Sequence, residues 1–202
     1  MAITDAGESK AWDLLDASDP AAICARAGVD FDPGAGGYRL TAFGHPFSIR
    51  PGDRQILNLE PAGEAFLKRH AYFFRLSALW YLVKAAAVCP SGTLVKPAGL
   101  PGGEIFFKGS HVLPLDALAA KYATRPEAFL AAGAALAGTP AAYGDAAVLL
   151  PALPKVPTTV ILWTADDEFP ARADLLFDAT APQQLPLDIL WSVAMMSLLP
   201  LL

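Results

Sequence analysis

The sequence predicts a single-domain α+β protein, with a small mixed or antiparallel sheet packed by a central apolar helix and a C-terminal helix. The chain of 202 residues has the usual size of one domain. Runs typical of strands and runs typical of helices are partly segregated along it, which favours α+β over a doubly wound sheet. The pattern over 63–88 is apolar around most of its circumference, as in a helix at the centre of a domain.

The first 60 residues are expected to form a helical and hairpin segment, ahead of a main body over 61–202. Asp19 and Pro20 indicate a helix start, because aspartate caps free N–H groups and proline fits the first helical position. Gly44 and His45 separate two short apolar runs, which indicates a hairpin turn. The elements expected here are helices over 10–17 and 21–27, a turn-rich linker over 30–37, hairpin strands over 38–43 and 46–50, and a third strand over 55–59.

The main body is expected to begin with the central helix and to end with an apolar one. Residues 158–164 (TTVILWT) are continuously apolar and β-branched, as in a strand buried on both faces. The segment 90–109 is rich in proline and glycine, and its clear strand is 104–108 (EIFFK). The expected elements are helices over 63–88, 115–122, 126–137 and 187–199, with strands over 104–108, 145–150, 158–164 and 175–177.

Composition and charge exclude several classes of protein. With 54% hydrophobic and 17% charged residues, the chain is neither disordered nor a coiled coil. Its net charge of -5 argues against a nucleic-acid partner. Cys24 and Cys89 by themselves cannot hold an iron–sulfur cluster or a four-cysteine zinc site. The first residues lack the pattern of a secretory signal, and Arg75 and Lys84 interrupt the most apolar window, so we expect a cytoplasmic protein without a transmembrane segment.

The apolar tail from Leu187 to Leu202 carries Asp188 as its single charge. Pro186 and Pro200 bracket a helix that is too short to span a bilayer. We therefore expect the tail to dock either on the core of its own chain or on a second subunit. In the second case it would be the surface of a homodimer or of a complex with another protein.

A glycine-flanked loop gives the first candidate ligand-binding site. Gly109, Ser110 and His111 follow the expected strand over 104–108. Glycine lets the backbone approach a ligand closely, while Ser110 and His111 supply a hydroxyl and an imidazole. The imidazole could ligate a metal or the iron or cobalt of a tetrapyrrole, or act as a base. The alternative is a turn whose histidine hydrogen bonds to the backbone.

An acidic turn gives the second candidate site. Asp167 and Glu168 follow the buried strand over 158–164, and Asp145 is expected on a neighbouring element. Carboxylate oxygens are the ligands that Mg²⁺, Mn²⁺ and Ca²⁺ prefer, so these three residues predict a divalent-metal site. Closely spaced carboxylates also raise one another's pKa, which favours a general acid or base. The alternative is a solvated turn in which one carboxylate pairs with Arg172.

The other polar residues carry weaker signals. His70 on the long helix is expected to be a surface or hydrogen-bonded core histidine, and His45 in a Gly-His-Pro turn is expected to be structural. Lys96, Lys108 and Lys155 could together form an anion-binding face, although nothing in their spacing requires it.

Several short motifs occur in an order shared with a known family. They are Phe-Lys-Gly-Ser-His over 107–111, Tyr-Gly-Asp-Ala over 143–146, Leu-Pro-Lys-Val-Pro over 153–157 and Asp-Asp-Glu-Phe-Pro-Ala over 166–171. Through them the chain resembles the domain of unknown function 3786 family, found mostly in anaerobic bacteria and archaea. The resemblance covers most of the chain and implies no particular activity. Some members resemble iron–sulfur proteins through an added cysteine-rich module, which this chain lacks, so no cluster is implied here.

Three functions stay open at this point. The favoured one is a cytoplasmic accessory protein that binds a small ligand or an organic cofactor, because apolar residues are abundant and clustered polar groups are few. The second is a divalent-metal-dependent, hydrolase-like enzyme that uses the acidic turn. The third is a protein-interaction subunit that docks through its tail. An enzyme should bring His111 and the acidic turn into one cleft, whereas a binding protein needs a pocket without a convergent acid–base pair.

Overall fold

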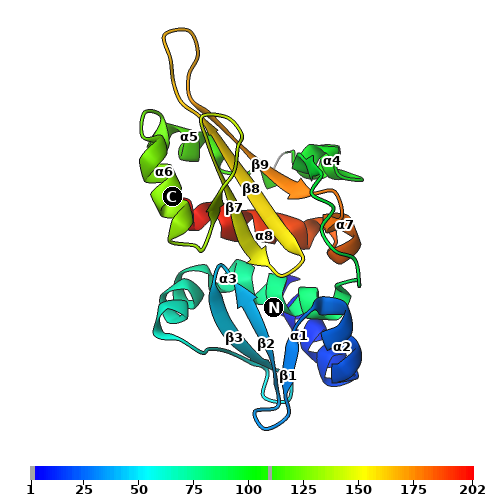
Figure 1. Ribbon diagram of the computed structural model, residues 1–202. Helices are drawn as coiled ribbons and strands as arrows, with labels where there is room; N and C mark the ends of the chain where they lie inside the picture. The colour runs from blue at the N-terminus through cyan, green and yellow to red at the C-terminus, as the bar shows by residue number, and fades with distance from the viewer. Residues whose placement is uncertain (1–2, 109–110) are drawn as a thin grey trace.

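The computed structural model describes residues 3–108 and 111–202, and in these residues the chain forms two antiparallel sheets with helices packed against them (Figure 1). The smaller sheet has the strand order β1-β2-β3-β4, and the larger one β5-β9-β8-β7-β6. The larger sheet lies above the smaller one in Figure 1, with α3 and α8 running behind their junction. A continuous hydrophobic cluster includes residues of both sheets, which confirms the predicted single-domain α+β fold.

The smaller sheet is a succession of hairpins. Gly44, whose φ is 77°, lies in the turn between β2 and β3, which confirms the predicted hairpin. The prediction of a linker over all of 30–37 is wrong, because β1 pairs with β2 through Asp30 and Arg39 and the ring of Phe31 packs on β2. The elements of this part are α1 (Ile3–Asp16), α2 (Pro20–Ala27), β1 (Asp30–Asp32), β2 (Gly37–Ala42), β3 (His45–Arg50) and β4 (Gln55–Asn58).

The helix α2 begins where the sequence predicts. The carboxylate of Asp19 accepts hydrogen bonds from the N–H groups of Ala21 and Ala22, each at 3.2 Å, and Pro20 occupies the first helical position. Such a cap contributes about 1 kcal/mol to helix stability. Gly28 ends the helix with a φ of 67°, a left-handed conformation that glycine adopts without a steric penalty. The chain then turns directly into β1.

The long helix α3 (Pro61–Lys84) lies at the centre of the domain, as predicted. It contacts α1, α8 and the strands β3 and β4. Its second half is the more deeply buried one, with Phe74, Ala78, Leu79 and Leu82 inaccessible to solvent. The backbone at His70 leaves helical geometry, with φ of −119° and ψ of 16°, so the helix is kinked at that residue.

The larger sheet has helices on one face. Its central strand β8 is buried along most of its length, as its continuous apolar run predicts. Helices α5, α6 and α8 pack behind the sheet, and its other face is turned toward the viewer in Figure 1. The strands are β5 (Leu94–Val95), β6 (Thr139–Pro140), β7 (Ala146–Leu153), β8 (Val156–Trp163) and β9 (Arg172–Asp178). The helices of this part are η1 (Pro97–Gly99), α4 (Gly103–Phe106), α5 (Leu115–Tyr122), α6 (Pro126–Ala134), α7 (Ala181–Gln184), α8 (Leu187–Leu198) and η3 (Leu199–Leu201).

The predicted strand over 104–108 is wrong, because this segment forms α4 and the turn that ends it. Gly103 packs so closely on the preceding turn that a Cβ atom there would lie 2.0 Å from the carbonyl oxygen of Pro97. The N–H of Phe107 donates to the carbonyl of Gly103, so the hydrogen bonds stay local. A short apolar run fits a helix and a strand equally well, and the side chain of Ile105 is exposed.

The apolar tail docks on its own chain. α8 buries most of its residues and contacts α3, and Leu201 in η3 is also buried. The hydroxyl of Tyr122 and the ammonium of Lys121 donate to the carbonyl of Leu201 at 2.7 and 2.9 Å. Of the two places expected for the tail, the structure shows the core of the same chain, and most of the apolar side chains from Leu187 to Leu202 are covered there. Among the helices of the two described ranges, none has the length and apolar character needed to cross a membrane.

Lys155, in the turn between β7 and β8, fastens the larger sheet to the ends of two helices. Its ammonium donates to the carbonyl of Arg26 in α2 and to that of Ala86 just after α3. The guanidinium of Arg26 donates in turn to the carbonyls of Leu82 and Ala85 at the end of α3. Carbonyls at the end of a helix have no partner within it, and a cation there also complements the helix dipole. We call this arrangement the Lys155–Arg26 clasp.

Replacing Lys155 by methionine should lower the free energy of unfolding by about 2 kcal/mol, because two carbonyl groups lose a charged hydrogen-bond donor. Urea denaturation at neutral pH measures the change. The control is Lys10→Met, which removes the same charge from an exposed position and should change the free energy by less than about 0.5 kcal/mol. Equal losses in the two variants would contradict the role of the clasp.

A buried carboxylate, that of Asp178 at the end of β9, organises the segment that leads into β5. It accepts hydrogen bonds from the N–H groups of Ser91, Gly92 and Thr180 at 2.7 to 3.0 Å, and from the hydroxyls of Ser91 and Thr180. Burial alone would raise the pKa of Asp178, but the hydrogen bonds outweigh burial and lower the pKa to about 2. The ionised form is therefore the one that stabilises the fold.

Asp178→Asn should lower the free energy of unfolding at pH 7 by about 2 kcal/mol, because an amide cannot accept all of these bonds. The pKa of Asp178 is lower in the folded state than in the unfolded one, so its contribution is present above about pH 4 and is lost as the pH falls toward 2. Urea denaturation at several pH values measures both effects. The same acid dependence in the variant and the parent would show that another group causes it.

Candidate ligand-binding site

The structure describes one of the three residues of the first predicted site, His111. Gly109 and Ser110 lie outside the described residues. The imidazole of His111 stacks on the ring of Phe106 from α4, with 4.2 Å between centroids, and meets the edge of Trp191 from α8 at 5.2 Å. His111 thus belongs to an aromatic cluster between these two helices. Ligand binding by Gly109, Ser110 and His111 stays a prediction from the sequence.

The residues of the acidic turn have separate surroundings. The carboxylate of Asp145 accepts the N–H and the hydroxyl of Thr164 at 2.7 and 2.8 Å, and these bonds lower the pKa of Asp145. Asp145 thereby ties the start of β7 to the end of β8. Asp167 and Glu168 are exposed in the β8–β9 turn. The described part of the chain contains no group of three or more His, Cys, Asp or Glu residues placed to hold a metal ion. The three predicted ligands, Asp145, Asp167 and Glu168, therefore do not form such a group.

The acidic turn and His111 lie in different parts of the molecule. The β8–β9 turn is at the upper tip of the larger sheet in Figure 1, whereas His111 lies against α4 and α8. Arg172 was expected to pair with a carboxylate of the turn. Its guanidinium lies 3.8 Å from the ring centroid of Trp163, in a cation–π contact. The structure therefore does not bring these groups into a common cleft.

The three lysines proposed as an anion-binding face have three different roles. Lys96 pairs with Asp174, and Lys108 pairs with Glu104 one helical turn away. Lys155 belongs to the clasp and donates to main-chain carbonyls. Each ammonium is already engaged, so the expected face does not form.

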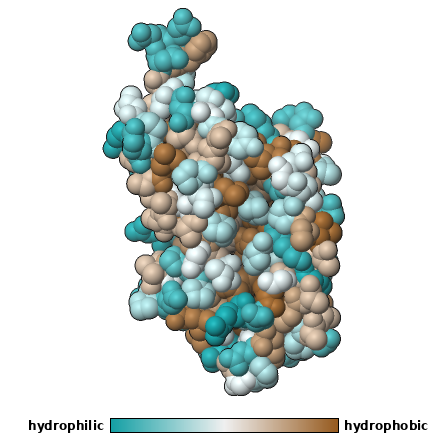
Figure 2. Space-filling view, in the orientation of Figure 1, coloured by the Kyte–Doolittle hydropathy of each residue, from teal (hydrophilic) through white to brown (hydrophobic). Residues whose placement is uncertain are grey.

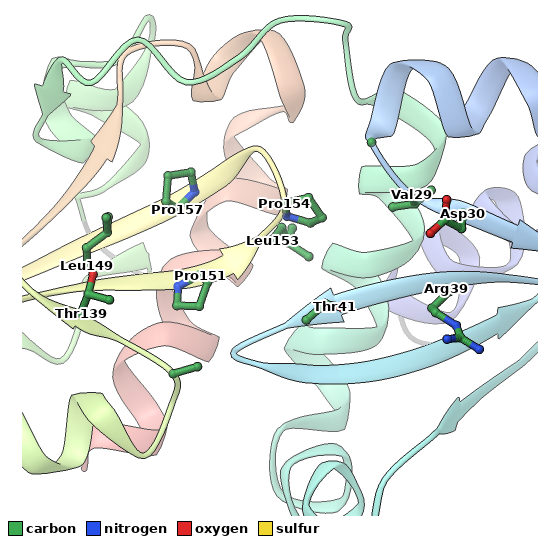
Figure 3. A pocket seen from close by; sticks show the side chains of 12 residues that line it. Val29, Asp30, Arg39, Thr41, Thr139, Leu149, Pro151, Leu153, Pro154 and Pro157 are labelled. Atoms are coloured by element: carbon green, nitrogen blue, oxygen red, sulfur yellow. The ribbon is translucent and has the colours of Figure 1, made fainter.

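A cleft of about 470 Å³ lies where the two sheets meet (Figure 3). One side is formed by β1 and β2 and the other by the hairpin of β7 and β8. The N–H of Phe43 donates to the carbonyl of Pro151 at 2.8 Å, which joins the two sheets beside the cleft. The turn at Gly44 lies so close to Ala137 that a Cβ atom on Gly44 would be 2.6 Å from the Cβ of Ala137. The volume is typical of a site for a small molecule.

The side chains around the cleft form an apolar wall and a polar end. Alternation along β7 produces the wall, because Leu149 and Pro151 are exposed while Val148, Leu150 and Ala152 are buried. Its residues are Leu149, Pro151, Leu153, Pro154 and Pro157. The prolines have no N–H, so the wall offers few donors to a ligand. The polar end comes from the smaller sheet, where Asp30 and Arg39 are direct partners in the β1–β2 register and Thr41 follows.

A second hollow of about 320 Å³ continues along the same face of the larger sheet. It shares Leu149 and Pro157 with the cleft and adds Leu94 and Tyr143. Figure 2 shows apolar residues along the hollowed middle of this face. The cleft and the hollow are therefore neighbours on this face, with Leu149 and Pro157 in the wall of both.

The polar groups of the cleft are suited to binding. Within the described residues that line it there are one carboxylate, one guanidinium and two threonine hydroxyls, and neither an imidazole nor a thiol. Asp30, Arg39 and Thr41 can hold and orient a polar group at one end of a ligand, while the wall, in which Thr139 lies beside Leu149, covers its apolar part.

This cleft was not predicted from the sequence, because its residues come from segments far apart in the chain. A partial signal was present in the proline spacing. Pro151, Pro154 and Pro157 recur every third residue where two predicted strands meet, and proline within a strand indicates an exposed or irregular face. Nothing in the sequence indicated that Asp30 and Arg39 line the same cleft as that segment.

Comparison with known proteins gives a family. A family model described as domain of unknown function (DUF3786) matches residues 19–198. No curated protein and no solved structure matches the chain.

Proposed function

The chain belongs to the family described as domain of unknown function DUF3786, and from this premise we propose that it binds a small molecule in the cleft between its two sheets. The observation that carries the proposal is the cleft itself, which combines a continuous apolar wall with a few polar groups at one end. Small-molecule sites usually have this composition. The role is that of a binding or accessory protein in the cytoplasm.

The walls indicate the kind of ligand. Leu149, Pro151 and Pro157 present apolar surface from neighbouring strands, which suits a flat apolar molecule such as an organic cofactor. Asp30 and Arg39 supply both an acceptor and a donor of hydrogen bonds, so the ligand carries a polar group at that end. No observation of comparable weight favours metal-dependent hydrolysis at the acidic turn or docking through the tail.

Filling the cleft should weaken the binding of an aromatic probe. Thr41 is exposed on β2 and lines the cleft, so Thr41→Trp places an indole there without disturbing the strand, in which tryptophan is favourable. We expect the affinity for anilinonaphthalene sulfonate, measured by fluorescence titration, to fall at least about fivefold, which is about 1 kcal/mol.

The matched control is Gln55→Trp, which adds an indole at an exposed position of β4 in the same sheet and outside the cleft. It should change the affinity by less than about twofold. If both variants bind the probe as the parent does, the probe site is not the cleft. If both lose binding equally, the effect comes from the added indole and the proposal fails.

A further inference from the structure

A separate cavity of about 300 Å³ lies beside the first half of α3, and its ionisable groups are all basic. Its wall includes His45 at the start of β3 and Phe66, Arg69 and His70 on α3, and it shares no lining residue with the inter-sheet cleft. Among the described residues that line it there is no carboxylate. The chain as a whole has a net charge of -5, so this cavity differs in charge from the molecule around it.

The side chain of His70 is buried, with 5% of its surface exposed, and its Nδ1 has no hydrogen-bond partner in the described part of the chain. This corrects the expectation of a surface or hydrogen-bonded histidine. The imidazole packs on Phe66 with 5.1 Å between centroids, and His45 approaches the same ring from 6.0 Å. Buried polar atoms are normally paired, so the unpaired Nδ1 of a histidine that lines a cavity is suited to contact a polar ligand there.

The electrostatics of the cavity favour an anion. Arg69 is an exposed residue of the cavity wall, and a guanidinium can bind two oxygens of one group at once. Ala62 in the first turn of α3 also lines the cavity, so the positive end of the helix dipole is nearby. Burial lowers the pKa of His70, and the charge of Arg69 lowers it further. A bound anion would act in the opposite direction and favour the imidazolium form.

We propose that this cavity binds a compact oxyanion of the phosphate class, held by Arg69, His45 and His70. Donors from three side chains match the oxygens of a tetrahedral group better than those of a planar carboxylate. The volume exceeds that of phosphate alone, so a small phosphorylated molecule also fits. The inference concerns residues of α3 and β3 and is independent of the proposal for the inter-sheet cleft.

Calorimetric titration of the full chain with inorganic phosphate, at constant ionic strength, tests the proposal. We expect the parent to bind phosphate, and Arg69→Gln and His45→Gln to weaken binding at least about fivefold each. Lys68→Gln is the matched control, because it removes a neighbouring exposed cation that does not line the cavity and should change binding by less than about twofold. Thermal unfolding of each variant verifies that the fold is intact.

Sodium acetate in a second titration separates the two kinds of oxyanion, and it should bind more weakly than phosphate. Acetate binding as tight as phosphate would overturn the phosphate class. Absence of phosphate binding to the parent at about 20 mM, or equal weakening in Lys68→Gln and Arg69→Gln, would overturn the site itself.

Discussion

The Lys155–Arg26 clasp is the polar contact that fixes the larger sheet to the two helices that also pack on the smaller sheet. It links the β7–β8 turn to the ends of α2 and α3 through two cations and four main-chain carbonyls. The hydroxyl of the buried Tyr81 adds a bond of 2.6 Å to the carbonyl of Ala27 beside it. The segment after α3 is also held by the buried Gln184, which accepts from the N–H of Ala86 and donates to the carbonyl of Val88, each at 2.9 Å. Because Lys155 lies next to Pro154, the same contacts hold the apolar wall of the cleft opposite β1.

The two cavities have different walls because different parts of the sequence form them. Alternation along β7 and the prolines of the β7–β8 hairpin leave a face that is apolar and poor in N–H donors. The cavity beside α3 instead takes its basic groups from a helix that is exposed in its first half and buried in its second. The fold thus offers one surface suited to an apolar ligand and another suited to an anion.

Much of the fold was predictable from local patterns. The two short apolar runs around Gly44, the cap at Asp19 and the continuous apolar run in β8 are local patterns, and each prediction made from them is confirmed. The strand predicted for 104–108 is wrong, because a short apolar run does not distinguish a strand from a helix.

The candidate cleft was not predictable, because its two sides meet only through long-range contacts. The ammonium of Lys155 donates a hydrogen bond to the carbonyl of Arg26, 129 positions away in the sequence, and no local pattern indicates that contact. The unpaired nitrogen of His70 likewise depends on what packs around it and not on its neighbours in the chain. Local sequence patterns therefore predict most of the secondary structure, whereas the cavities depend on tertiary packing that these patterns do not show.

The measurement that tests the central claim most directly is amide chemical-shift mapping by NMR of the full chain titrated with anilinonaphthalene sulfonate. The account predicts the largest shifts at Val29, Thr41, Thr139 and Leu149, which line the cleft, and small ones at Gln55. Shifts centred on another surface, or no shifts at saturating probe, would contradict a ligand site between the two sheets.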